Sequence, residues 1–315
     1  MKNLKMLSLM AAALLIGTQG YAQESDDVTA ESTMAIDDAA NKNEATEEEV
    51  ITNRKMLAEA GSKSKYSLST SLGYSGGSIK DPLNAVRPNI VGEVGSKDFA
   101  DLGGSVSGRY RLDSTSNLSA GVGITWVAPL ETEKPEGLET NRVDASEPYL
   151  GYTKVKAWSN GVQSVLGATL TVYTDSFYRD LGYQTGMSFS ANNVYEIGES
   201  GVSLGVLGSV GFRTFDKVGS AVYSRQSDYS GGIYPFLEYV INDTFNLRTI
   251  SGVWVYQHRR SEEDLTFSKN VIYQSVGVGI SVTRDIFLYP NVQFIPEDIR
   301  DDRTNVAMSA SINLF

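Results

Sequence analysis

Residues 102–112 read Leu-Gly-Gly-Ser-Val-Ser-Gly-Arg-Tyr-Arg-Leu, and every larger apolar residue in this stretch falls on an even-numbered position. A repeat of two places alternate side chains on opposite faces of a β-strand. The same pattern, with Leu207 as an exception, returns in residues 202–212, Val-Ser-Leu-Gly-Val-Leu-Gly-Ser-Val-Gly-Phe. Both stretches therefore predict strands with one apolar face and one face of small or polar residues.

The alternation continues from about Lys65 to Phe315 in stretches of roughly ten residues. Their connections are alternately very short, as in the hairpin signal Ser159-Asn160-Gly161, and long. In a soluble β-sandwich, nothing requires short and long loops to alternate. In a membrane barrel they do alternate, because its tight turns lie on one side of the membrane and its longer loops on the other.

Twelve such stretches are counted, with ten or fourteen strands as the alternatives, and an even number places both ends of a barrel on the same side. No segment after the N-terminus approaches the ~20 apolar residues that a spanning helix needs, whereas a spanning strand needs only ~9–11. Pro235 and Pro290 fall inside predicted strands, where they predict bulges. The predicted strands cover residues 66–74, 102–112, 118–126, 149–157, 166–172, 183–195, 202–212, 233–241, 245–255, 272–282, 288–294 and 306–314.

The first 22 residues have the composition of a secretory signal peptide. Lys2 and Lys5 precede an apolar run from Met6 to Ile16, and Gly20-Tyr21-Ala22 supplies a small-residue cleavage site. The apolar run is too short for a transmembrane anchor. The chain has no cysteine, which excludes a lipoprotein anchor and disulfide bonds.

An acidic segment, residues 23–64, precedes the predicted barrel of residues 65–315. It carries most of the net charge of −11, so acidity says little about the partners of the barrel, and we expect no nucleic-acid partner. Disorder is expected up to about Asn43. A short helix is predicted over residues 47–60, with Thr46 as N-cap and Gly61 at its end. This helix is either part of a solvated spacer, or it plugs the lumen or docks on a periplasmic partner.

With its signal peptide, alternating connections and terminal Phe315, the chain resembles the outer-membrane β-barrel proteins of Gram-negative bacteria. The resemblance implies an all-β, transmembrane, antiparallel up-and-down barrel with its N-terminus in the periplasm. It also implies contact with outer-membrane lipid and lipopolysaccharide, and recognition of Phe315 by the barrel-assembly machinery. The terminal apolar row here is Leu314, Ile312 and Ala310, so Asn313 stands two residues before the end.

Charged residues on the inward face are expected to gather in the periplasmic half of the lumen. Five cations against one acid favour anions in a narrow pore. The alternative is a salt-bridge network that closes the lumen, with the acidic N-terminal segment as its counter-charge. The predicted basic cluster consists of Arg109, Arg111, Lys154, Lys156 and Arg248, with Glu238 as the neighbouring acid.

These features predict a passive channel for small hydrophilic solutes, with a possible preference for anions. A closed structural or adhesive barrel that binds through its external loops is the alternative. A hydrolase is less consistent with the sequence, because the single histidine, His258, has no nucleophile placed on the same strand face; Ser261 is three residues away in a loop. With one histidine and no cysteine, no metal or other cofactor is expected, and we expect no enzyme activity.

Overall fold

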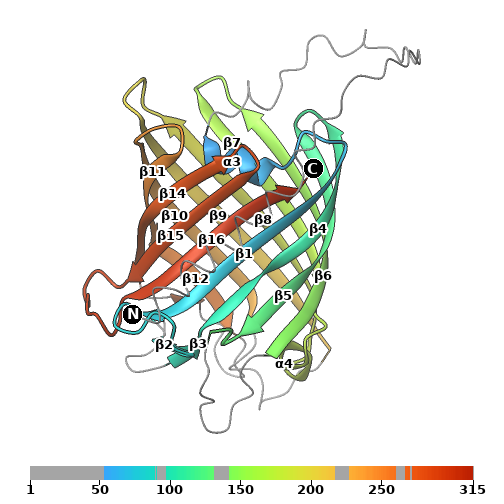
Figure 1. Cartoon of the computed structure of the whole chain (residues 1–315). Coiled ribbons are helices and arrows are strands. Elements are labelled where there is room, and N and C mark those ends of the chain that lie inside the picture. Colours follow the sequence, from blue (N-terminus) through green and yellow to red (C-terminus); the bar gives the residue numbers. More distant parts are fainter. Residues whose placement is uncertain are drawn as a thin grey trace, which may run out of the picture. The chain divides into compact units, whose positions relative to one another are not determined.

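The computed structural model describes residues 53–88, 90, 97–130, 142–216, 227–259, 267–269 and 272–314, which belong to one compact unit. Its strands form an antiparallel barrel (Figure 1). The proposed signal peptide, the acidic segment up to residue 52 with the predicted N-cap Thr46, and Phe315 lie outside the described residues. The wall consists of β1 (Tyr66–Ser78), β4 (Asp101–Asp113), β5 (Ser116–Val127), β6 (Arg142–Ala157), β7 (Val162–Val172), β8 (Tyr183–Glu196), β9 (Val202–Phe215), β10 (Ser227–Val240), β11 (Phe245–Gly252), β12 (Trp254–Arg259), β14 (Tyr273–Thr283), β15 (Ile286–Phe294) and β16 (Asn305–Leu314).

The barrel closes because β10 pairs with β9 on one side and with both β11 and β12 on the other. The segments β11 and β12 are two parts of one wall strand, so the wall has the predicted twelve strands. The first strand, β1, pairs with the last, β16. The prediction of a twelve-stranded up-and-down barrel is confirmed.

The connections alternate in length as the sequence indicates. At the end of the barrel where β1 begins and β16 ends, the turns are short, as at Ser114-Thr115 and Arg284-Asp285. We call this the helix end, because the helix α3 (Arg54–Ala60) lies there. The opposite end, the loop end, carries the longer connections, which include the hairpin β2 (Val86–Pro88) and β3 (Lys97–Phe99), the helix α4 (Ser176–Asp180) and β13 (Phe267–Lys269).

The two faces of the wall differ in character. Large apolar side chains such as Leu204, Val210 and Leu247 remain 47–48% exposed on the outside. The inward face carries small polar residues such as Ser69 and Ser107, which are buried. An apolar outer band around a polar interior is typical of barrels that span a lipid bilayer. Among the described residues, no helix has the length and apolar character needed to cross a membrane.

The two strand prolines behave differently. At Pro235, β10 changes partner: Phe236 pairs with Ile250 of β11, and Ile233 pairs with Trp254 of β12, which leaves one extra residue on the opposing strand. Proline lacks the N–H that a continuous ladder requires, so the break falls beside it. The predicted bulge at Pro290 is wrong, because β15 keeps a constant register with β16 through this residue.

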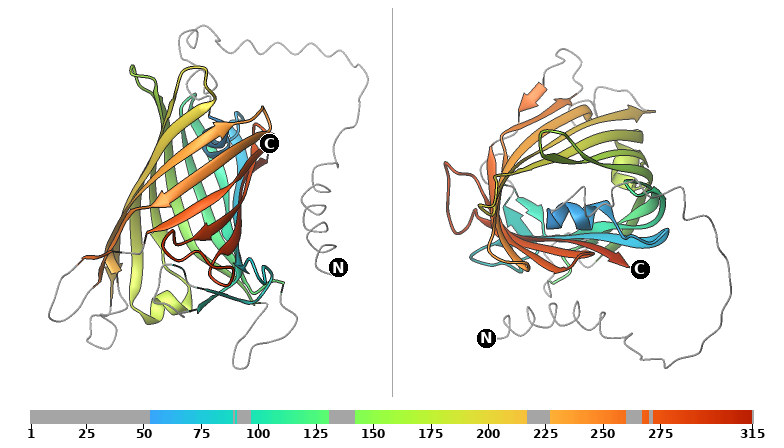
Figure 2. Two further views of the ribbon diagram at one scale, coloured as in Figure 1. Left: turned by 90° about the vertical axis from the view of Figure 1, so that its left-hand side faces the viewer. Right: turned by 90° about the horizontal axis from the view of Figure 1, so that it is seen from above.

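A short helix, α3 (Arg54–Ala60), lies within the ring of strands at the helix end (Figure 2). It is shorter than the predicted helix of residues 47–60, because Asn53 is its N-cap. Gly61, the predicted end, is its C-cap, with a φ of 99° that favours glycine. The helix lies near β6 and β7 on one side and β14, β15 and β16 on the other.

Candidate functional site: the lumen and the helix inside it

Apolar contacts hold α3 from two sides. Met56 is fully buried, and with Leu57 and Ala60 it forms a cluster with wall residues from β6, β7, β8 and β10. On the other side, Ala58 packs with Phe287 and Tyr289 of β15. The helix therefore bridges the lumen instead of lining one wall. The wall members of the larger cluster are Val155, Val165, Val194 and Phe236.

The C-terminal end of α3 is bonded to the barrel wall. The last carbonyl groups of any helix lack partners within the helix. Here the carbonyl oxygens of five consecutive residues each accept a hydrogen bond from a wall or turn side chain, and three of the donors are arginines, whose charge also suits the negative end of a helix. The pairs are Asn313 to Ala58 (2.8 Å), Arg109 to Glu59 (3.3 Å), Asn117 to Ala60 (3.0 Å), Arg284 to Gly61 (3.2 Å) and Arg111 to Ser62 (3.3 Å).

The N-terminal end of α3 is fixed by Asn53. Its Oδ1 accepts from the backbone N–H of Met56 at 3.2 Å, which is the usual N-cap bond. Its Nδ2 donates to Oε2 of Glu238 at 2.6 Å. Glu238 is fully buried, and its other oxygen pairs with Arg248, which lies directly opposite on β11. A buried carboxylate is thus satisfied by one guanidinium and one amide.

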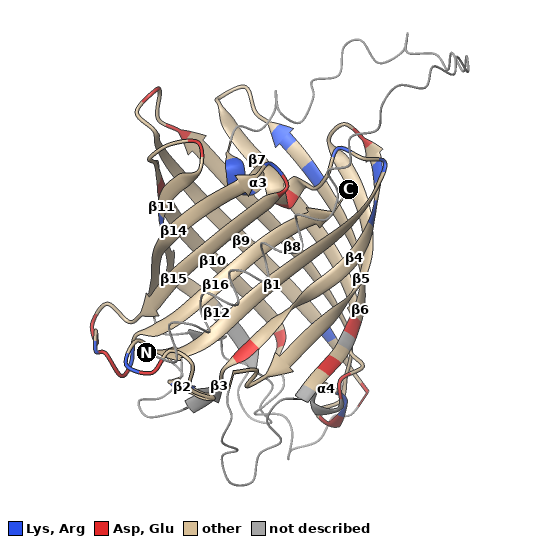
Figure 3. Cartoon of the chain, in the orientation of Figure 1, with Lys and Arg blue, Asp and Glu red and all other residues tan. Residues whose placement is uncertain are grey.

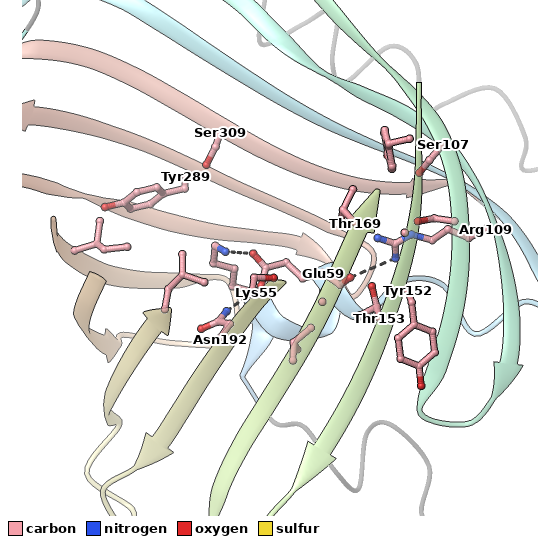
Figure 4. A pocket seen from close by; sticks show the side chains of 18 of the residues that line it. Lys55, Glu59, Ser107, Arg109, Tyr152, Thr153, Thr169, Asn192, Tyr289 and Ser309 are labelled. Atoms are coloured by element: carbon pink, nitrogen blue, oxygen red, sulfur yellow. Dashed lines mark hydrogen bonds and ion pairs between the residues drawn. The ribbon is translucent and has the colours of Figure 1, made fainter. Parts of the chain in front are cut away.

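A second set of contacts joins the side of α3 to the wall (Figure 4). The carboxylate of Glu59 pairs with Lys55 one turn earlier and accepts from Nδ2 of Asn192 on β8 at 3.0 Å. Burial by itself raises the pKa of the Glu59 carboxyl, but Lys55, Arg248 and Asn192 outweigh that effect and lower it from its ordinary value. Glu59 is therefore held as an anion by the docked helix.

A cavity of about 460 Å³ lies in the lumen beside α3. The helix contributes Lys55 and Glu59 to its lining, and the wall contributes residues that include Arg109 and Asn192 (Figure 4). Arg248 also lines the cavity. The remaining wall residues are mostly small or hydroxylated. The interior next to the helix is therefore a polar space rather than a packed apolar core.

Four of the six charged residues in the predicted cluster lie in this region. Figure 3 shows basic residues at the helix end of the barrel. Arg109 and Arg111 reach backbone carbonyls of the α3 segment, and Arg248 pairs with Glu238. Their observed contacts hold the helix in place. Whether they also select anions stays a prediction.

Lys154 and Lys156 do not face the lumen, which corrects their predicted placement. Their neighbour Val155 belongs to the cluster around Met56, so alternation along β6 turns both lysines outward. Lys154 pairs with Asp113 at 3.6 Å, and Lys156 lies 3.6 Å from the ring centre of Trp158. Val155 can be apolar on the inward face because α3 covers it. At this point of β6 the apolar side chain faces the lumen and the lysines face outward, which is the reverse of the predicted arrangement.

The other residues singled out from the sequence add no chemistry that the described structure can test. His258 pairs in register with Tyr229 of β10, and its side chain is outside the described part. Phe315, the predicted assembly signal, also lies outside it. Among the described residues, no group of three His, Asp or Glu side chains is arranged to hold a metal ion.

Sequence reasoning missed the amide side chains that dock the helix. Asparagine is depleted in strands, yet three inward positions of the wall that bond to α3 carry one, so this departure from ordinary strand composition was an available signal. Arg284, in the β14–β15 turn, gave no such signal, because charged residues are common in turns. These asparagines are Asn117, Asn192 and Asn313.

No protein-family model matches the chain, and no curated protein sequence is significantly similar to it. Similar folds occur among solved structures. An outer membrane channel from Pseudomonas putida F1 has a TM-score of 0.49 and 12% identity, over 81% of this chain and 97% of that one. The NanC porin has a TM-score of 0.43 and 9% identity, over 78% and 97%. LpxR from Salmonella typhimurium has a TM-score of 0.40 and 14% identity, over 79% and 99%. At these identities the likeness is one of fold alone.

Proposed function

We propose that this protein is an outer-membrane channel for small hydrophilic solutes, which its own helix α3 holds closed. The observation that carries the proposal is the position of α3, which contacts opposite sides of the wall through Met56 and Ala58. A barrel of twelve strands is intermediate between those filled by side chains and those with open channels. A helix inside it occupies the space through which solutes would pass.

The contacts that hold α3 in the lumen are of a kind that allows the helix to leave it. The described part of the helix has only seven residues. Its apolar clusters are small, and much of its attachment consists of hydrogen bonds to side chains that water could replace. The polar cavity beside it would be continuous with a passage once the helix moved.

Anion preference is the finer part of the proposal, and it now rests on fewer wall residues. With Lys154 and Lys156 outside, the wall cations near the helix are Arg109, Arg111 and Arg248. Glu238 compensates Arg248 directly. Departure of α3 would remove the carbonyl oxygens of Glu59 and Ser62 from Arg109 and Arg111, and both guanidinium groups would then face the passage, where a low dielectric strengthens their field.

We also propose the environment that the resemblance implies. The helix end would face the periplasm, the outer band would contact outer-membrane lipid and lipopolysaccharide, and the assembly machinery would recognise the C-terminus at Phe315. The direction of the short turns and long loops supports this orientation.

A permanently closed structural or adhesive barrel is the second candidate. The five consecutive carbonyl groups bonded to the wall favour it, since each bond adds to the stability of the closed state. In that case the function would lie in the connections at the loop end. The two candidates differ in one measurable respect, which is whether releasing α3 permits ion flow.

Conductance of the full mature chain in planar bilayers tests the proposal. Met56→Glu places a carboxylate in a fully buried apolar position and should expel α3. We expect small or rare currents from the wild type and sustained currents from this variant. Ser64→Glu adds the same charge at an exposed position just beyond the helix and should behave as the wild type does. A Met56→Glu barrel that is folded, loses protection of α3 against trypsin and still carries no current would establish the closed barrel instead.

A further inference from the structure

The cavity beside α3 has the size of a small-molecule site. Its volume of about 460 Å³ lies within the ~300–1,000 Å³ that is usual for such sites. The helix contributes Lys55 and Glu59 to the lining, and wall strands on both sides of the helix contribute the rest. The cavity therefore has this shape only while α3 is docked, which separates it from the open passage considered above.

The charged groups that line the cavity already have partners. Among the described lining residues, Lys55 pairs with Glu59, and Arg248 pairs with Glu238 of the neighbouring strand. Arg109 donates to the backbone carbonyl of Glu59 and has a further interaction in the structure. An ion that enters the cavity would lose its hydration without finding an unpaired charge of opposite sign, and burying an unpaired charge is costly. The lining therefore favours a neutral ligand.

The hydroxyl groups in the lining differ from the charged groups, because they are not engaged. Serine and threonine side chains from six strands line the cavity, and none of their hydroxyls has a hydrogen-bond partner in the part of the chain that the structure describes. Each hydroxyl can donate and accept, so a ligand with several hydroxyl groups could bond to several of these residues at once. The residues are Ser107, Ser119, Thr153, Thr169, Ser190 and Ser309.

Apolar groups complete the lining. The side chains of Val165, Leu207 and Ile250 line the cavity together with Tyr149 and Tyr289. A purely apolar ligand would pack against these groups but would leave the serine and threonine hydroxyls without partners. A sugar ring carries hydroxyl groups at its edge and C–H groups on its faces, so one molecule matches both kinds of lining.

Asn192 supplies an independent observation. Its side chain is 7% exposed and lines the cavity, and its Nδ2 donates to Glu59. Its Oδ1 is buried and accepts no hydrogen bond from any residue that the structure describes. A buried acceptor without a donor is costly, and a ligand hydroxyl that packs against this side chain would supply the missing donor.

We propose that this cavity binds a small neutral sugar, and that the bound sugar holds α3 in the lumen. The sugar would contact the wall and the helix residues Lys55 and Glu59 together, so it binds more tightly when α3 is docked. A ligand with a higher affinity for one of two states shifts the equilibrium toward that state. Binding itself is independent of the proposed function, whereas the role of the sugar in keeping the channel closed rests on it.

Titration calorimetry on the full mature chain tests binding without any need for conductance. The detergent must have no sugar headgroup. Glucose, galactose and mannose are the probes, because they differ only in the orientation of single hydroxyl groups. Gluconate adds a negative charge, and cyclohexanol is a ring of similar size with one hydroxyl. We expect saturable binding of at least one hexose, at least tenfold tighter than binding of either comparison compound. Absence of saturable binding of all three hexoses, or equal affinity for gluconate or cyclohexanol, would overturn the proposal.

Three variants locate the site. Thr169→Val keeps the shape of the side chain and removes only its hydroxyl, and should weaken hexose binding about threefold to tenfold. Thr171→Val is the matched control, because Thr171 has the same orientation on β7 but does not line the cavity. Met56→Glu should abolish saturable binding, since it expels the helix that completes the cavity. Unchanged affinity in Thr169→Val, an equal loss in Thr171→Val, or undiminished binding to a Met56→Glu barrel with a released helix would show that the sugar binds elsewhere.

Tryptic cleavage after Lys55 tests whether the sugar holds the helix. Trypsin reaches this site only in the undocked state, so a hexose at ten times its dissociation constant should slow cleavage of the wild type about tenfold. Cleavage of Thr171→Val should slow to the same extent, and gluconate should have no effect. Unchanged cleavage of the hexose-saturated protein would overturn the role of the sugar in closure. Failure of the channel proposal would appear separately, as a released helix without current.

Discussion

Asn53 donates its Nδ2 to Oε2 of Glu238 across 2.6 Å, and this bond joins residues that are 185 positions apart in the chain. The same asparagine caps the first turn of α3, and the same carboxylate pairs with Arg248. The start of the helix is thus tied to two neighbouring wall strands, β10 and β11, through one buried acid. Loss of that acid affects the cap and the buried cation together.

Glu238→Ala should release α3 more strongly than Asn53→Ala. The first change leaves Arg248 buried without its carboxylate, and breaking a buried pair costs roughly 3–5 kcal/mol. The second removes the N-cap bond and the amide partner of Glu238, and loss of an N-cap costs about 1 kcal/mol. Tryptic cleavage after Lys55, followed by mass spectrometry, reports the undocked fraction. Slower cleavage in Glu238→Ala than in Asn53→Ala would contradict this account of the docking.

A covalent link between α3 and β15 should lock the barrel closed. Ala58 packs against Phe287 in a buried cluster, and the chain has no cysteine of its own. In Ala58→Cys combined with Phe287→Cys, the introduced thiols are the only ones present, and we expect oxidation to join them. Currents from the oxidised protein should be lower than those from the same sample after reduction. Equal currents before and after reduction would mean that conduction does not require α3 to move. Each single-cysteine variant is the matched control.

The barrel was predictable because its signals are local and repeated. Alternation such as that of residues 102–112 sets the faces of each strand, and short turns such as Arg284-Asp285 set the helix end. The helix was predictable only in part. Its C-cap, Gly61, follows from the need for a positive φ, whereas its N-cap depends on a partner, Glu238, that is distant in the sequence. Local patterns cannot supply such a partner.

The inward face of β6 could not be predicted from alternation alone. The register between β5 and β6 shifts between Gly121 and Gly123 of β5, opposite Glu147, which has a φ of 57°. The inward and outward positions before this shift therefore do not continue in the same alternation after it. Val155 is apolar because Met56 covers it inside the lumen. A rule that assigns apolar residues to lipid therefore places Lys154 and Lys156 on the wrong face. The rule fails wherever a plug provides a second apolar environment.

Ion selectivity should depend on Arg109 and not on Lys156. Arg109 lines the cavity, whereas Lys156 lies over Trp158 on the outer face. In a Met56→Glu background, Arg109→Gln removes a charge from the passage and should shift the reversal potential in a salt gradient toward cations. Lys156→Gln removes the same charge from the outside and should leave the potential unchanged. An equal shift in both variants would place the selectivity outside the lumen.

Acid should favour release of α3 through Glu59. The docked helix lowers the pKa of this carboxyl from its ordinary 4.5, so the docked state binds fewer protons than the undocked state. The stabilisation from Glu59 is therefore complete above about pH 4.5 and is lost as the pH falls through the lower pKa of the docked state. Open time in planar bilayers should increase over that interval in the wild type.

Glu59→Gln separates this carboxyl from other acids that titrate in the same interval. Glutamine can still accept from Nδ2 of Asn192, but it cannot pair with the charge of Lys55. The variant should be open more often at pH 7 and should show a smaller further increase on acidification. If its open time rises with acid as steeply as that of the wild type, Glu59 is not the group that responds. The responding group would then lie elsewhere, because glutamine has no carboxyl to protonate.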